Sequence, residues 1–343
     1  MQSQPVLEVA MRRALELALN GPSVGINPQV GAVILDESGA IVSEGWHEGS
    51  GTPHAEVMAI HNLRTKLGVH KFPAGYTAVV TLEPCNHQGK TGPCALALID
   101  SGISAVAYAS EDPGVASAKG AQTLRDSGVE VVSGILLSEA EEQNRVWLTA
   151  NRLGRPFVTL KYASSLDGRS AAEDGSSQWI SGPESRAESH LRRSQIDAIL
   201  VGTGTALDDD PELTARRPDG SYYEAQPLRV VLGERELPKT LRIFNDKAQT
   251  LELKTHSIHG ALAELWARGV KHVWVEGGPK IASKFEKLGL VDEYIIYLAP
   301  MLLGGDRTSL RNIGVESIKD AHHLKFIETK MLGNDLFIRA RRK

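Results

Sequence analysis

Residues 54–56 of the chain read His-Ala-Glu, and residues 83–94 read Glu-Pro-Cys-Asn-His-Gln-Gly-Lys-Thr-Gly-Pro-Cys. The second stretch contains Cys85 and Cys94, the only two cysteines in the 343-residue sequence. The imidazole of His54 and two thiolates offer three ligands to Zn²⁺, and a catalytic zinc site keeps its fourth tetrahedral position open for water. The pattern therefore predicts an open zinc site with His54, Cys85 and Cys94 as ligands.

Glu56 lies two residues after His54, where a carboxylate can transfer protons without binding the metal. The order His-x-Glu, Pro-Cys and a second Cys is typical of zinc-dependent deaminases. Zinc lowers the pKa of its bound water from about 15.7 to about 7, which makes hydroxide available at neutral pH. We expect Glu56 to take the proton of this water as hydroxide attacks an amino-bearing ring carbon, and then to protonate the departing ammonia.

The cysteines also have plainer interpretations, because they could be inert core residues or form a disulfide, and a lone histidine is often structural. The combination of elements in the right order favours the metal site. Eight residues separate the two cysteines, whereas the general deaminase motif is C-x-x-C. A more particular variant of the motif is therefore expected.

Length and charge limit the class of protein. A chain of 343 residues exceeds the usual size of a single core, so two domains are expected. A formal net charge of −4 argues against a nucleic-acid partner. No run of about twenty apolar residues suggests a membrane span, and cysteines assigned to a metal suit the reducing cytoplasm, where we place the protein.

The first half alternates helical and strand patterns, which predicts a three-layer α/β/α domain with its sheet between helices. Helix 55–67 begins directly after the expected ligand His54, so its dipole favours anions at the site. A helix over 136–148 is expected to close the domain. We place the boundary near 150, giving domains 1–150 and 151–343. The other predicted helices are 5–19, 94–100 and 118–127, and the predicted strands are 30–35, 41–44, 77–82, 106–109 and 129–132.

Residues 11–18, 27–33 and 84–94 resemble the deaminase domain of the bifunctional riboflavin-biosynthesis deaminase–reductases, within the cytidine-deaminase superfamily. The long segment between the cysteines distinguishes this family from nucleoside and tRNA deaminases. The resemblance implies a diaminopyrimidinone substrate that carries a ribosylamino 5′-phosphate. The residues that it implies for the substrate pocket are Asn27, His47, His87 and Lys90.

The second half contains a glycine-rich turn at 276–279 between a predicted strand and a predicted helix, where backbone N–H groups could bind phosphate. Alone, this turn could equally be a plain tight turn, and no G-x-G-x-x-G motif opens the domain. Residues 161–169, 177–180, 202–211, 276–279 and 299–305 together resemble the reductase domain of the same family. This resemblance implies a dihydrofolate-reductase-like α/β fold that uses NADPH, while residues 232–272 carry little signal.

The resemblance also implies roles for individual residues of the second half. Lys161 would assist proton transfer during reduction. The residues implied for cofactor contact are Ala163, Trp179, Thr205, Asp209, Gly278, Pro279, Lys280 and Ile281. Those implied for substrate contact are Ser177, Arg193, Leu213, Arg216 and Glu276, of which the two arginines suit a phosphate.

The function expected from these features is a bifunctional enzyme that deaminates a phosphorylated pyrimidine and then reduces its ribosyl side chain to ribityl. Its partners would be this small-molecule substrate and a second copy of the chain, with no nucleic acid and no membrane. A nucleoside or tRNA deaminase with an accessory domain is the alternative. A non-catalytic zinc-binding module is a third possibility, although such a module would have no need of Glu56.

Overall fold

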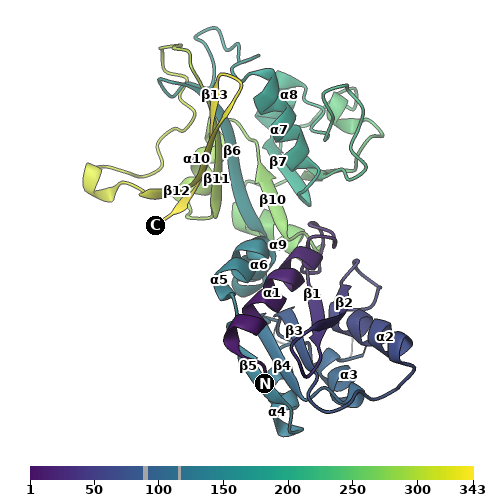
Figure 1. Ribbon diagram of the computed structural model, residues 1–343. Helices are drawn as coiled ribbons and strands as arrows, with labels where there is room; N and C mark the ends of the chain where they lie inside the picture. Colours follow the sequence, from purple (N-terminus) through teal and green to yellow (C-terminus); the bar gives the residue numbers. More distant parts are fainter. Residues whose placement is uncertain (88–91, 115–116) are drawn as a thin grey trace. The chain divides into compact units, whose positions relative to one another are not determined.

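A computed structural model describes residues 1–87, 92–114 and 117–343. The chain divides into two compact units, Met1–Gly154 and Arg155–Lys343, and each has its own sheet (Figure 1). None of the helices in the described ranges is long and apolar enough to cross a bilayer. The predicted mixed α/β class is confirmed for both halves.

The sheet of the first unit has the strand order β2-β1-β3-β4-β5. Strand β1 runs antiparallel to β2 and β3, whereas β3, β4 and β5 run parallel. All residues of β1, β3 and β4 are buried, as expected for apolar runs in a sheet covered on both faces. The strands are β1 Gly31–Leu35, β2 Ile41–Trp46, β3 Thr77–Leu82, β4 Ala105–Ser110 and β5 Glu130–Ser133.

Helices cover both faces of this sheet, which confirms the predicted three-layer sandwich (Figure 1). Helix α1 presents an apolar stripe that includes Leu7 and Met11 to Val33 and Val79 of the sheet. The helices on this face are α1 Gln4–Ala18 and α5 Leu137–Gln143. On the opposite face are α2 Ala55–Leu67, α3 Cys94–Ser101 and α4 Gly120–Asp126, together with Leu148 of α6 Arg145–Leu153.

The single helix predicted over 136–148 is wrong, because the chain forms α5 and α6 with a break at Asn144. Asparagine side chains bond readily to nearby backbone and so interrupt helices. Here the Asn144 side chain bonds to the backbone of Gln29. Helix α6 then continues to Leu153, past the boundary predicted near residue 150, and ends at Gly154, whose φ of 63° is left-handed.

The sheet of the second unit has the order β12-β13-β11-β6-β10-β7-β8-β9. Its strands run parallel from β11 to β9, and β13 is antiparallel to both β11 and β12. The strands are β6 Phe157–Ser165, β7 Ala198–Gly202, β8 Leu228–Leu232, β9 Thr250–Leu253, β10 His272–Val275, β11 Glu293–Ala299, β12 Leu324–Leu332 and β13 Asp335–Arg342.

Two helices pack on each face of this second sheet. Helices α9 Ile258–Ala267 and α10 Pro279–Lys287 share one core with the sheet, whereas α7 Pro183–Arg193 and α8 Thr203–Asp209 lie on the other side. Short 3₁₀ helices η1 Arg242–Phe244 and η2 Ile318–Asp320 complete the unit. Strand β9, helix α9 and η1 all fall within 232–272, where the sequence carried little signal.

Strand β10 lies between β6 and β7, so the chain reverses its direction of travel across the sheet at this point. Ligands in open α/β sheets bind beyond the carboxyl ends of the strands at such a switch point. The parallel register pairs Val275 with Leu160, which places Glu276 close to Lys161. The topology thus brings the ends of β6, β10 and β7 to one candidate site.

The free energy of unfolding of the second unit should fall between pH 7 and pH 5 because of His272. Its ring packs edge-on against Phe157 and hydrogen-bonds to Thr159 Oγ1 at 2.8 Å, and burial lowers its pKa to about 3. Below pH 6.5 the unfolded chain gains a proton that the folded chain does not, so we expect a loss of about 1 to 2 kcal/mol at pH 5. Urea unfolding should show a smaller loss in His272→Gln; an equal loss would contradict this assignment.

Candidate functional site

Three elements of the first unit bring the predicted zinc ligands together. His54 immediately precedes α2, Cys85 follows β3, and Cys94 is the first residue of α3. Nδ1 of His54 lies 3.1 Å from Sγ of Cys94 and 3.5 Å from Sγ of Cys85, and all three donor atoms lie within 4.8 Å of one another. Both cysteines are free and buried, so the disulfide interpretation is wrong.

The thiols of this cluster differ in acidity. Hydrogen bonds from Cys94 and His54 lower the pKa of Cys85 to about 4, whereas the pKa of Cys94 is raised by its bond to Cys85 and by burial. A ready thiolate beside an imidazole is what a metal ion requires of its ligands. One nitrogen and two sulfur donors that converge in this way fit zinc with one coordination position left open.

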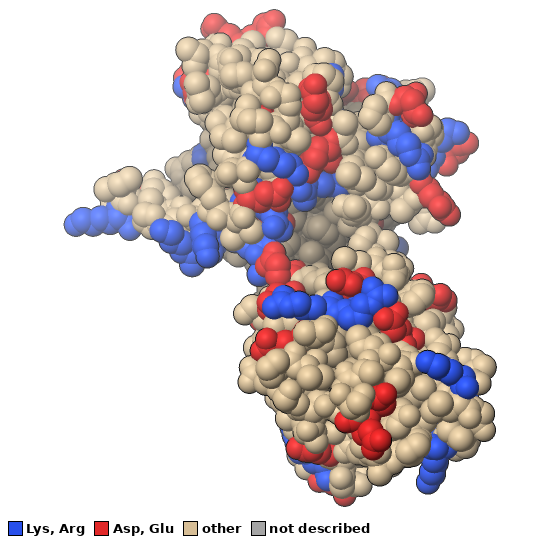
Figure 2. Space-filling view, viewed as in Figure 1, with Lys and Arg blue, Asp and Glu red and all other residues tan. Residues whose placement is uncertain are grey.

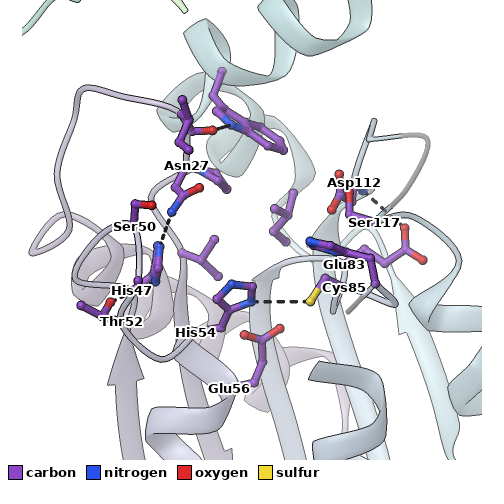
Figure 3. A pocket seen from close by; sticks show the side chains of 17 residues that line it. Asn27, His47, Ser50, Thr52, His54, Glu56, Glu83, Cys85, Asp112 and Ser117 are labelled. Atoms are coloured by element: carbon purple, nitrogen blue, oxygen red, sulfur yellow. Dashed lines mark hydrogen bonds between the residues drawn. The ribbon is translucent and has the colours of Figure 1, made fainter. Parts of the chain in front are cut away.

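Glu56 lies beside these donors at the start of α2, with only 5% of its surface exposed. Figure 3 shows its carboxylate below the His54 ring, next to the Cys85 sulfur. Burial raises the pKa of Glu56 to about 7. A carboxyl group with a pKa near neutrality can both accept and release a proton at physiological pH.

His54, Cys85 and Glu56 line a cavity of about 270 Å³ together with the predicted residues Asn27, His47 and His87. Nδ2 of Asn27 donates to Nε2 of His47 at 2.9 Å, as drawn in Figure 3, and Nδ1 of His47 lies 3.1 Å from the Pro53 carbonyl. Because a carbonyl only accepts, Nδ1 carries the hydrogen and His47 is neutral. Burial lowers the pKa of His47 and so favours this form.

The structure places His87 in the same cavity, and its buried Nδ1 has no hydrogen-bond partner within the described ranges. The prediction for Lys90 falls on residues 88–91, which lie outside the described ranges.

The lining residues that were missed from the sequence include Glu83, Asp112, Ser117 and Trp147. Glu83 accepts hydrogen bonds from the backbone N–H groups of Asp112 at 3.3 Å and Ala121 at 3.0 Å, and so holds the segment after β4 against the site. Their positions in the sequence could have revealed Glu83 and Asp112, because they lie one and two residues after neighbouring parallel strands whose carboxyl ends meet. Nothing local marked Trp147.

In the second unit, Glu276 is the centre of a buried ion cluster. Arg193 binds both of its carboxylate oxygens, at 3.0 and 2.6 Å, and Trp274 Nε1 donates to it at 2.8 Å. Nζ of Lys161 lies 3.9 Å away. Burial alone would raise the pKa of Glu276, but the charges of Arg193 and Lys161 lower it well below its usual value. Burial lowers the pKa of Lys161.

This cluster lies in a cavity of about 650 Å³, a size typical of sites for large ligands. The predicted residues that line it are Lys161, Ala163, Ser177, Trp179, Arg193, Thr205, Asp209, Leu213, Arg216, Glu276, Gly278 and Pro279. Two predicted residues do not line it. Lys280 is exposed, and the Ile281 side chain packs beneath Gly202 and Gly277.

The glycine-rich turn is tightly constrained. A Cβ on Gly277 would lie 2.7 Å from Cβ of Ile281, so only glycine fits there. The N–H of Gly278 donates to Thr205 Oγ1 at 3.1 Å and joins the turn after β10 to the first turn of α8, which directly follows β7. These two turns form a cradle at the carboxyl ends of adjacent strands, which fits a dinucleotide.

The two arginines predicted to bind phosphate both have internal partners. Arg193 is bound to Glu276 and also donates to the Thr214 carbonyl at 3.1 Å, while Arg216 pairs with the buried Glu212. Their guanidinium groups are therefore held in place by carboxylates rather than lying free in the cavity. Further lining residues that the sequence did not reveal are His190, Tyr297 and Arg242.

Several charged side chains elsewhere on the first unit form ion pairs. Figure 2 shows basic and acidic side chains next to one another on the viewed face of this unit. Among the pairs are Arg13 with Glu44, Arg145 with Glu142 and Arg152 with Glu141. Neighbouring charges of opposite sign give little net attraction for a polyanion.

The chain matches two protein-family models. The cytidine and deoxycytidylate deaminase zinc-binding region matches residues 5–110, and the RibD C-terminal domain matches residues 156–338. The riboflavin biosynthesis protein RibD of Mycobacterium tuberculosis H37Rv is 47% identical over 312 residues, covering 91% of this chain and 90% of the relative. These matches include both units.

Solved structures are similar over the whole length. RibD of Acinetobacter baumannii has a TM-score of 0.89 at 33% identity, covering 99% of this chain and all of that one. A diaminohydroxyphosphoribosylaminopyrimidine deaminase/5-amino-6-(5-phosphoribosylamino)uracil reductase from Thermotoga maritima has a TM-score of 0.86 at 34% identity, covering 99% of both chains.

Proposed function

The chain belongs to the RibD family of bifunctional deaminase–reductases of riboflavin biosynthesis, and we propose its substrate, cofactor and site residues on that basis. The substrate is 2,5-diamino-6-(5-phosphoribosylamino)pyrimidin-4-one, which is first deaminated. The ribosyl side chain of the product is then reduced to give 5-amino-6-(5-phosphoribitylamino)uracil. The Thermotoga maritima relative, which is named as this deaminase and this reductase, supports the choice.

The observation that carries the proposal is the convergence of His54, Cys85 and Cys94 beside the buried Glu56. A purely structural zinc site has four protein ligands and no need of a proton-transferring acid. The described residues offer three donors and one such acid. This arrangement suits a hydrolytic deaminase and speaks against a non-catalytic zinc module.

For the deaminase, His54, Cys85 and Cys94 hold zinc, which when bound supplies a water activated for attack at neutral pH. Glu56 accepts a proton from the attacking water and returns it to the departing ammonia. The Asn27–His47 pair orients the pyrimidine through its remaining hydrogen-bonding groups. His87 and Lys90 complete the substrate contacts.

For the reductase, the nicotinamide cofactor supplies a hydride when bound, and we propose that it is NADPH. Lys161, held beside Glu276, transfers the accompanying proton to the sugar. Arg216, oriented by Glu212, binds the 5′-phosphate. Arg193 holds Glu276 toward the substrate. Ser177 and Leu213 also contact the substrate. The residues proposed for cofactor contact are Ala163, Trp179, Thr205, Asp209, Gly278 and Pro279, all of which line the cavity.

We also propose a cytoplasmic location and a homo-oligomeric assembly, both of which remain predictions. The alternative of a nucleoside or tRNA deaminase is not favoured, because the RibD relatives match both units of the chain. We therefore assign deamination to the first unit and reduction to the second.

The proposal is tested by incubating the enzyme with the diaminopyrimidine phosphate, with and without NADPH. Without NADPH, mass spectrometry should find a product in which one amino group is replaced by oxygen. With NADPH, a second product should carry two additional hydrogens. Ammonia release from cytidine or tRNA at a comparable rate, with no turnover of the diaminopyrimidine, would overturn the proposal.

A further inference from the structure

The corner between α5 and α6 lies between the regions that the two family models match, 5–110 and 156–338. Its central residue, Asn144, is 6% exposed and hydrogen-bonds twice to one residue of the first unit. Its Oδ1 accepts from the backbone N–H of Gln29 at 3.0 Å, and its Nδ2 donates to the carbonyl of Gln29 at 2.7 Å. The side-chain amide thus pairs with backbone as a neighbouring strand would.

Trp147, one turn further along α6, makes a related contact. Its indole N–H donates to the carbonyl of Ile26 at 2.9 Å, and the residue lines the cavity that contains the zinc ligands. The corner therefore hydrogen-bonds to the backbone at residue 26 and at residue 29. The side chain of Gln29 adds a bond to the Gly21 carbonyl at 2.7 Å.

Asn27 lies between Ile26 and Gln29, the two residues bound by the corner, in a stretch that forms neither helix nor strand. Such a segment has no secondary structure to hold its side chains in place, and ordering it costs conformational entropy. Asn27 nevertheless donates to His47 Nε2 in the cavity. The hydrogen bonds from the α5–α6 corner provide the missing support.

We propose that Asn144 is a positioning residue of the deaminase, and that the α5–α6 corner is a working part of that site rather than a linker. Asn144 acts through Gln29 to hold Asn27 against His47, in the orientation that receives the pyrimidine. The inference rests on the proposed role of Asn27 in substrate binding.

The test compares three alanine variants: Asn27→Ala, Asn144→Ala and Gln143→Ala. Gln143 is the matched control, because it belongs to the same corner but donates to the Leu15 carbonyl in α1. Deamination of the diaminopyrimidine phosphate should show a KM raised roughly tenfold in Asn144→Ala, equivalent to about 1.4 kcal/mol. Its kcat should change less, zinc content should stay at the wild-type level, and Gln143→Ala should match the wild type within about twofold.

Two further measurements keep the proposal testable if Asn144→Ala folds poorly. Trp147→Phe removes the bond to Ile26 but keeps an aromatic side chain in the cavity lining, and it should raise KM in the same direction. Backbone hydrogen exchange at Gln29 should accelerate in Asn144→Ala, independently of activity. An unchanged KM in Asn144→Ala alongside a raised KM in Asn27→Ala would overturn the inference, whereas an unchanged KM in Asn27→Ala would overturn the proposed role of Asn27 itself.

Discussion

Replacing Glu56 by Gln is expected to lower the rate of deamination by about 10³-fold or more while zinc remains bound, because general acid–base catalysis contributes about 10² to 10⁴. The amide is similar in size to the carboxyl group and leaves His54, Cys85 and Cys94 in place. It cannot accept a proton from water or deliver one to ammonia. NADPH oxidation on the deaminated substrate should persist, since reduction takes place in the other unit.

The measurements are ammonia release, metal content and NADPH oxidation on the same preparation. Glu37→Gln is the control, because Glu37 is an exposed carboxylate in the turn between β1 and β2 of the same unit. Loss of both activities in Glu56→Gln would count against two separate sites. Retention of deamination would show that another group moves the proton.

Replacing Glu276 by Gln is expected to abolish reduction and to spare deamination. The substitution removes the one negative charge that Arg193 contacts at 2.6 Å and that lies 3.9 Å from Lys161. Two largely buried cations would then face each other, and breaking a buried ion pair in this way costs about 3 to 5 kcal/mol. We expect the free energy of unfolding of the second unit to fall by about that much.

A matched variant distinguishes an effect of Glu276→Gln on the reductase site from its effect on stability. Glu293 is also buried and ion-paired, with Arg341 at 2.9 Å and Arg339 at 3.7 Å, but it does not line the reductase cavity. Glu293→Gln should lower stability and leave KM for the deaminated substrate unchanged at 25 °C. If both variants lose reduction in proportion to their stability, Glu276 has only a structural role.

Local sequence patterns predicted best those strands and helices in which every residue lies in a similar environment, such as a strand that is buried from end to end. Strand β3 was predicted at its observed ends, because it is a largely apolar run that is buried along its whole length. Strand β9 and helix α9 were missed. Strand β9 has only four residues and lies at the edge of its sheet, where the apolar pattern is weakest.

The break at Asn144 shows the limit of periodicity. Helical spacing continues through this position, and the partner of its side chain is Gln29, 115 residues earlier in the chain. Trp147 was missed as a lining residue for the same reason. Contacts over such separations depend on how helices and loops pack, which no local pattern reports.

The sequence by itself determined the chemistry of the first site: three ligands suited to zinc and one acid, identified by residue type and order. Only the tertiary structure decided that His54, Cys85 and Cys94 converge from three separate elements, and that Arg193 and Lys161 share Glu276. The physical reason is that residue type sets which bonds a side chain can form. Strand register, helix packing and loop closure set the distance at which distant residues meet, and these depend on the whole chain.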